Sequence, residues 1–265
     1  MKKKYELTEE TTEVNGRILH RIKAVRDFGC VKAGYLGGFI QKEENLSQEG
    51  NAWVYGDAKV YDNANVCGNA KVCGNAKVYG DAKVYDNANV YDNANVYDNA
   101  NVYGDARVCG DAWVCGDAWV YGDAKVYGDA WVCGDTRVYG DAKVYGDAWV
   151  CGDTRVYGDA RVFDNAEVCG NAKVYGDAKV YGDARVCGDA EIKNNTDYIV
   201  FKNFWSSGRF FTWTRSNNMW KVGCFYGTGE ELIKKAYEDS KKSGREYERV
   251  VRYVESILAD ERKEE

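Results

Sequence analysis

Apolar and polar residues alternate with an almost uninterrupted six-residue period between Asn51 and Ile192. Each unit reads Val-(Tyr/Cys)-Gly-(Asp/Asn)-Ala-x, and Val recurs at every sixth position from Val54 to Val186. In an extended segment successive side chains point to opposite sides, so Ala and Val share one side while x and Tyr/Cys share the other. Because x is often Lys or Arg, we expect Val and Ala to fill a thin core and the other side to face solvent.

A second period shows how these units are arranged in space. The heptapeptide at 131–137 returns unchanged at 149–155. Five cysteines also lie 18 residues apart, namely Cys115, Cys133, Cys151, Cys169 and Cys187. Six residues therefore form one side and eighteen form one turn, which predicts an all-β solenoid with three sides and about eight turns over residues 50–192. The Gly, Asp and Asn residues at the corners tolerate left-handed backbone conformations.

The two ends of the chain lack the repeat. Residues 1–49 contain two strand-like stretches with Asn15-Gly16 as the turn between them, and we expect a cap that covers the open edge of the first turn. Residues 193–265 predict an α+β domain with a three-stranded meander over 198–204, 209–214 and 219–225, followed by two helices. The pairs Thr228/Glu231 and Ser243/Glu246 match the capping-box pattern at the two helix starts.

Composition narrows the class of protein. The net charge of −6 disfavours nucleic-acid binding, and no apolar run approaches the roughly 18 residues of a membrane span. The first residues carry Lys but no apolar core, so we expect no signal peptide and no membrane partner. A cytoplasmic location with reduced thiols follows from that expectation.

The repeats resemble those of the left-handed β-helix hexapeptide-repeat proteins, in which a small residue follows an aliphatic one by four positions, as in Val54/Ala58 and Val60/Ala64. This resemblance covers a little over half of the chain and implies a left-handed coil. Segments 31–40 and 45–54 look like the start of the YdcK-type bacterial proteins, which are assigned as transferases by similarity of fold. The resemblance implies an acyl-transfer site with a His base, acyl-CoA bound between the solenoids of a trimer, and an inserted loop.

This chain offers little of that chemistry. Its single His, His20, precedes the repeats, and no loop interrupts them. One His also excludes the three-His zinc site of the γ-class carbonic anhydrases that share the fold. We therefore expect no catalytic residue, no cofactor and no metal, although Asp135 or Asp153 could serve as a general base. Packing explains the cysteine column better than metal or redox chemistry, and structure explains the Asp/Asn corners better than calcium binding.

The outward columns carry the candidate binding residues. Eight of these residues are singled out as binding or interface candidates: Trp113, Trp131, Trp149, Trp119, Arg137, Arg155, Tyr139 and Tyr157. The first three lie beside cysteines and predict a wide apolar strip. Such a strip is typical of an interface, although stacking within the chain would also explain it.

Taken together, these patterns favour a non-catalytic scaffold or binding protein. We expect it to self-associate as a trimer or dimer and to engage a partner or a small anionic ligand through its aromatic faces. One alternative is an acyltransferase-like enzyme of the hexapeptide family. Another is a protein that sequesters an anionic metabolite between solenoids.

Overall fold

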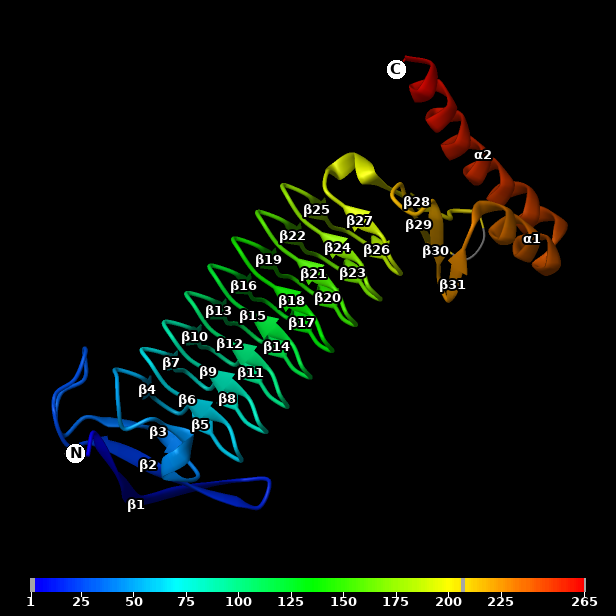
Figure 1. Cartoon of the computed structure of the whole chain (residues 1–265). Coiled ribbons are helices and arrows are strands. Elements are labelled where there is room, and N and C mark those ends of the chain that lie inside the picture. Colours follow the sequence, from blue (N-terminus) through cyan, green and yellow to red (C-terminus); the bar gives the residue numbers. More distant parts are fainter. Residues whose placement is uncertain (1–2, 206–207, 265) are drawn as a thin grey trace.

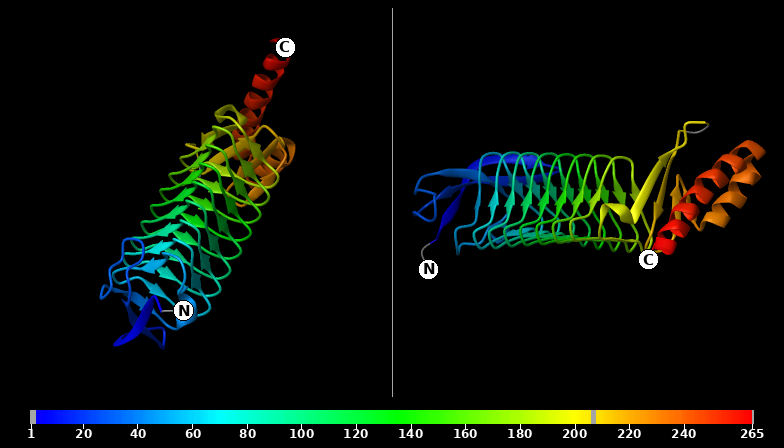
Figure 2. Two further views of the ribbon diagram at one scale, coloured as in Figure 1. Left: turned by 60° about the vertical axis from the view of Figure 1, so that its left-hand side comes forward. Right: turned by 90° about the horizontal axis from the view of Figure 1, so that it is seen from above.

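A computed structural model describes residues 3–205 and 208–264 and shows a β-solenoid of about nine turns, followed by a smaller β and α region (Figures 1 and 2). Two-residue parallel strands stack into three sheets along the rod, and the core Val of one turn lies in register with the Val, or finally Ile192, of the next turn. The Trp113 amide donates to the Ala130 carbonyl at 2.9 Å, and the same ladder recurs along the repeats. The three-sided coil predicted from the 18-residue period is thus confirmed.

The three faces are named here by their outward residues. The tryptophan face consists of β5 (Lys59–Val60), β8 (Lys77–Val78), β11 (Asn95–Val96), β14 (Trp113–Val114), β17 (Trp131–Val132), β20 (Trp149–Val150), β23 (Glu167–Val168) and β26 (Arg185–Val186). The arginine face consists of β6 (Asn65–Val66), β9 (Lys83–Val84), β12 (Asn101–Val102), β15 (Trp119–Val120), β18 (Arg137–Val138), β21 (Arg155–Val156), β24 (Lys173–Val174) and β27 (Glu191–Ile192). The lysine face consists of β4 (Trp53–Val54), β7 (Lys71–Val72), β10 (Asn89–Val90), β13 (Arg107–Val108), β16 (Lys125–Val126), β19 (Lys143–Val144), β22 (Arg161–Val162) and β25 (Lys179–Val180).

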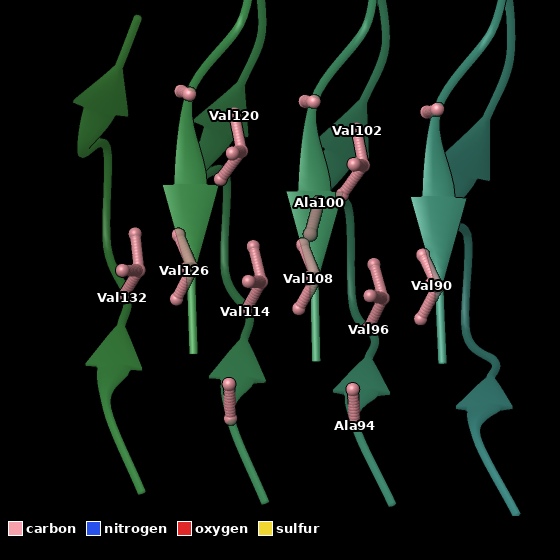
Figure 3. Close-up of a cluster of buried hydrophobic side chains, with 14 of the residues drawn as sticks. Val90, Ala94, Val96, Ala100, Val102, Val108, Val114, Val120, Val126 and Val132 are labelled. Atoms are coloured by element: carbon pink, nitrogen blue, oxygen red, sulfur yellow. The ribbon is translucent and has the colours of Figure 1, made fainter. Parts of the chain in front are cut away.

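Val and Ala from all three faces fill the interior, as the alternation predicts. Figure 3 shows Val96, Val102 and Val108 entering this core from successive sides, and each is completely buried. Two Thr residues occupy Ala positions inside it. The Thr136 hydroxyl donates to the Cys133 carbonyl at 2.7 Å and lies 3.1 Å from the Thr154 hydroxyl. These bonds compensate the cost of burying a hydroxyl.

The N-terminal segment adds strands to the rod as well as covering its end. After the hairpin of β1 (Tyr5–Val14) and β2 (Arg17–Ala24), β3 (Leu36–Ile40) pairs in parallel with β5. The 3₁₀ helix η1 (Glu43–Asn45) follows, and Leu46 forms a parallel bridge with Val66. This additional turn lacks the hexapeptide pattern, which explains why the repeats alone indicated about eight turns.

Side chains satisfy the backbone groups that the ladder leaves open at both ends. At the first turn, the Lys4 ammonium donates to the Ala52 carbonyl at 2.9 Å and the Asn45 amide to the Ala64 carbonyl at 2.8 Å. At the last turn, free N–H groups need acceptors instead. The C-terminal region supplies these acceptors. The Arg185 amide donates to Thr212 Oγ1 at 2.8 Å, the Glu191 amide to Ser216 Oγ at 2.7 Å, and the Lys179 amide to Asn195 Oδ1 at 2.9 Å.

The C-terminal region contains one strand more than the meander expected from the sequence. Its elements are η2 (Asn195–Asp197), β28 (Tyr198–Lys202), β29 (Phe210–Thr214), β30 (Met219–Val222), β31 (Phe225–Gly227), α1 (Gly229–Asp239) and α2 (Lys241–Glu264). The short β31 pairs with β30, and residues 206–207 of the expected β28–β29 link lie outside the described residues. Within the described chain, neither helix combines the length and apolarity that a membrane crossing requires.

One of the two expected helix caps is correct. Thr228 caps α1 by accepting from the Glu231 amide at 3.3 Å. The second expectation was wrong, because α2 begins at Lys241 and Ser243 lies inside it. Instead, the Ser240 hydroxyl accepts from the Ser243 amide at 3.0 Å, so the capping residue precedes the expected one by three positions.

The corner residues between the faces adopt left-handed backbone conformations, which glycine tolerates better than other residues. Gly140 adopts φ +68°, and a Cβ there would lie 3.1 Å from the Gly158 nitrogen. Asp86 occupies the equivalent corner with φ 57°, and its carboxylate accepts from the Gly104 amide at 3.3 Å. We expect Gly140→Ala to cost about 1–2 kcal/mol through the left-handed backbone. Gly140→Asp should cost less, because its carboxylate can accept from the Gly158 amide. Urea midpoints followed by circular dichroism compare the two variants, and a larger loss for Asp would contradict this account.

Candidate functional site

The tryptophan strip comprises Trp113, Trp131 and Trp149 on the consecutive strands β14, β17 and β20. The Trp113 and Trp131 rings stack with centroids 4.8 Å apart and planes 4° apart. Trp149 instead presents its edge to Trp131 at 5.8 Å and 64°, so only the first two rings of the strip stack face to face. Trp131 remains 39% exposed and Trp149 51% exposed, which leaves an outward apolar surface on this face.

The cysteine column runs beside the tryptophan strip and contains Cys115, Cys133, Cys151, Cys169 and Cys187. Its backbone follows the ladder, as the 18-residue spacing predicts, because the Cys115 amide donates to the Val132 carbonyl at 2.9 Å.

The C-terminal end of the cysteine column contains a disulfide that the sequence analysis did not predict. We expected in-register thiols to stay unpaired, but Cys169 and Cys187 form a disulfide. The spacing between turns places their Cα atoms 4.6 Å apart. This distance lies within the range of about 4.4–6.8 Å that a disulfide needs.

Cys133 occupies the centre of a hydrogen-bonded group that joins the column to the strip. Hydrogen bonds with the Cys115 and Cys151 thiols, together with one from the Trp149 indole, lower the pKa of the Cys133 thiol. The bond to Cys133 and burial raise the pKa of Cys115 and of Cys151. The thiolate form of Cys133 is therefore favoured over that of its two neighbours.

A groove of about 560 Å³ follows the corner between the tryptophan and arginine faces. Its lining residues come from four successive turns: Asp117, Trp119, Asp135, Arg137, Asp153, Arg155, Asn171 and Lys173. Three carboxylates and three cationic side chains thus line one surface. These opposite charges balance, so the groove has no net positive charge that would attract an anion.

Asp135 differs from most other corner residues in its electrostatics. A hydrogen bond with Asp153, together with the charges of Asp153 and Asp117, raises the pKa of the Asp135 carboxyl. Elsewhere in the same column Asn alternates with Asp, and the Asn99 amide donates to Asp117 at 2.8 Å. Asp117 thus has an Asn one turn before it, whereas Asp135 and Asp153 each follow another aspartate and lack such an amide donor.

The remaining candidates lie on the arginine face but have different surroundings. The Arg137 guanidinium lies 5.8 Å from the centre of the Trp119 ring, and both residues line the groove with Arg155. Tyr139 and Tyr157 stack on each other at 5.0 Å within a longer tyrosine column. The structure thus brings Trp119, Arg137 and Arg155 together in the groove, whereas the two tyrosines mainly contact one another along the rod.

The single histidine lies far from these surfaces along the fold. His20 belongs to β2 in the N-terminal hairpin, and its Nδ1 lies 3.2 Å from the Thr8 carbonyl oxygen. Because a carbonyl only accepts, Nδ1 donates in this pair. This bond gives His20 a local role between β1 and β2.

The side chains of Trp53 and Lys4 are buried, which the sequence analysis did not predict. Trp53 occupies an outward x position, yet it is fully buried against Tyr5 and Phe28, with ring centroids 6.1 Å and 5.2 Å away. Lys4 is also fully buried, and burial lowers the pKa of its ammonium to about 8. A signal for Trp53 was present, because it is the only Trp at the start of the repeats, where the cap was expected.

Comparison with known proteins gives one partial match. The chain is 39% identical over 61 residues to a protein of Escherichia coli (strain K12) described as "Uncharacterized acetyltransferase YdcK". The match covers 20% of this chain and 19% of that relative, so it spans about a fifth of either protein. No protein-family model matches the chain. The match and the solenoid together fit the hexapeptide-repeat transferase superfamily.

The carboxylate run predicts a pH-dependent stability. A raised carboxyl pKa means that the folded chain binds the proton more tightly than the unfolded chain, so stability falls as pH rises through this range. We expect Asp135→Asn to raise the melting temperature at neutral pH by removing the repulsion. This gain in melting temperature should shrink as the pH falls toward and below 3.8, the ordinary pKa of an aspartate carboxyl. Asp81→Asn is the matched control, since Asn63 and Asn99 lie on either side of Asp81 in this column. An equal gain in the control would contradict the repulsion.

Proposed function

We propose that this protein is a non-catalytic β-solenoid scaffold that self-associates through the tryptophan strip. The observation that carries the proposal is the exposure of Trp131 and Trp149 beside Trp113 on one straight face. A large aromatic side chain offers about 150–250 Å² for burial. Contiguous exposed apolar surface of this kind usually marks an interface on an otherwise polar protein.

Charge supports a second copy of this chain as the partner. Rows of exposed aspartates flank the tryptophan strip on both corners: Asp111, Asp129 and Asp147 on one side, and Asp117, Asp135 and Asp153 on the other. The lysine face carries the complementary pattern at the same turns, namely Arg107, Lys125, Lys143 and Arg161. A parallel neighbour would therefore place cationic side chains over the Trp rings and between the acidic rows, where cation–π attraction and opposite charges both act.

Such a contact joins different faces of two identical rods. Contacts of this kind close into a ring when the rotation between copies permits it. The arrangement accords with the left-handed coil and the trimer that the hexapeptide resemblance implies, and a dimer is the smaller assembly the same faces can form. The proposal needs no cofactor and no nucleic acid or membrane.

The strip gives a direct test of self-association. We expect Trp131→Lys/Trp149→Lys to reduce the particle to the single-chain mass of 29.7 kDa, because lysines would face the cationic side chains of the neighbour. Light scattering measures the mass, and circular dichroism checks that the β-structure persists. Lys125→Glu/Lys143→Glu should also weaken the assembly, because it reverses the charge of the lysine face that would contact the neighbour's tryptophan strip. Tyr139→Lys/Tyr157→Lys on the arginine face is the matched control and should leave the mass unchanged. An unaltered mass in the tryptophan variant contradicts the proposal.

The second candidate function is acyl transfer, favoured by the partial match to the acetyltransferase-named relative. His20 is the imidazole available to it, and Asp135 in the groove is the alternative base. His20 is engaged with Thr8 in the N-terminal hairpin, outside the groove. A sequestering role for an anionic metabolite gains no support from the balanced charges of that groove.

We expect His20→Ala to leave fold, assembly and any biological effect intact. A general base typically contributes about 10²–10⁴-fold to the rate, so its loss would be plain in an assay. A screen across acyl-CoA donors, repeated with His20→Ala and with Asp135→Asn, provides the measurement. Turnover that collapses in either variant would establish the enzyme and replace the scaffold proposal.

A further inference from the structure

The end of the cysteine column brings three metal-ligating groups together. The Sγ atoms of Cys169 and Cys187 and a carboxylate oxygen of Glu167 all lie within 4.8 Å of one another. The hydrogen-bond ladder sets this arrangement, because β23 and β26 are adjacent strands and the Cys169 amide donates to the Val186 carbonyl at 2.8 Å. Among the described residues, this is the group of three such side chains that meets the distance needed for a common ion.

We propose that Glu167, Cys169 and Cys187 form a binding site for a thiophilic divalent cation of the zinc type when the Cys169–Cys187 disulfide is reduced. A small thiol supplies the reducing equivalents: two thiol molecules become one disulfide, and the protein gains two cysteine thiols. Both cysteine protons then pass to water as the ion binds two thiolates and one carboxylate oxygen, and water completes the coordination.

The geometry suits an ion of this size. Zinc binds sulfur at about 2.3 Å and carboxylate oxygen at about 2.0–2.2 Å, so ligand atoms around a tetrahedral ion lie about 3.5–3.8 Å apart. The two bonded sulfurs lie closer together than this and must move apart on reduction, whereas the carboxylate oxygen lies within 4.8 Å of both. Rotation of the side chains can make both adjustments once the sulfurs are free. Thiolates favour soft and borderline ions over magnesium or calcium, which prefer oxygen.

The charges around the site also balance. Two thiolates and the Glu167 carboxylate supply three negative charges, whereas the ion supplies two positive ones. The Arg185 guanidinium supplies the third, with its Nε 3.4 Å from Glu167 Oε2. The second carboxylate oxygen of Glu167 remains for the ion. A neutral cluster is the arrangement that costs least to hold in a partly buried position.

The position in the fold separates this pair from the rest of the column. Cys115, Cys133 and Cys151 have Trp residues at the neighbouring outward positions, whereas Cys169 has Glu167. Cys187 is only 6% exposed, and the C-terminal region contacts the same turn through Thr212 and the hydroxyl of Tyr226. The ion would thus link the last two turns where the rod meets that region. This inference is independent of self-association.

Cadmium titration of the reduced chain tests the site. The whole protein is reduced with a phosphine, which does not compete as a thiol, and the ultraviolet thiolate-to-cadmium charge-transfer absorption is followed. We expect one ion per chain, displaceable by zinc. Cys169→Ser/Cys187→Ser should abolish this absorption, and Glu167→Gln should weaken the affinity at least about tenfold while keeping both sulfurs. The disulfide form should show no such absorption.

Cys73→Ser/Cys109→Ser is the matched control, because these cysteines occupy the same position of the repeat on the lysine face with Tyr91 between them. The control should keep the wild-type stoichiometry and affinity. Circular dichroism confirms the fold of each variant, and Glu167→Gln provides the decisive test if the double serine variant fails to fold. Absence of cadmium binding to the reduced wild type would overturn the proposal. Unchanged binding by Glu167→Gln, or loss of binding in the control, would also overturn it.

Discussion

The hydrogen-bond ladder between successive turns constrains every other feature of this protein. Each inner strand donates to the turn that follows it, as the Trp113 amide does to the Ala130 carbonyl, and this bond fixes the rise between turns. Side chains of one kind must therefore stack directly on one another. The tryptophan strip, the cysteine column and the tyrosine stacks are all products of that register. The same ladder leaves carbonyls open at one end and amides open at the other.

The two ends solve different chemical problems with different residues. Carbonyls need donors, and the buried ammonium of Lys4 and the amide of Asn45 supply them. Amides need acceptors, and Thr212, Ser216 and Asn195 supply oxygen atoms. Without such partners, the terminal strands would be open edges available to another chain. The non-repetitive segments thus match the polarity of the particular end that each one covers.

The repetitive part of the fold was predictable because its geometry is local and periodic. A residue's place in the hexapeptide determines its face, its neighbours and its burial, so the columns followed from counting. Trp53 broke that rule because contacts from Tyr5 and Phe28, distant in sequence, override its outward position. The groove was missed for a related reason: its character depends on three successive aspartates beside Arg137 and Arg155, a combination that no single repeat reveals. The disulfide and Ser240 cap likewise depend on individual side-chain contacts rather than on a period.

The stacking of equivalent turns has a geometric consequence for the whole molecule. An inner turn touches only the turns before and after it, and both of those present the same backbone outline. Loss or gain of one complete eighteen-residue turn would therefore preserve the seams at the N-terminal hairpin and at the C-terminal sheet. Each such change would lengthen or shorten the rod by one fixed step, the rise between turns that the backbone ladder sets.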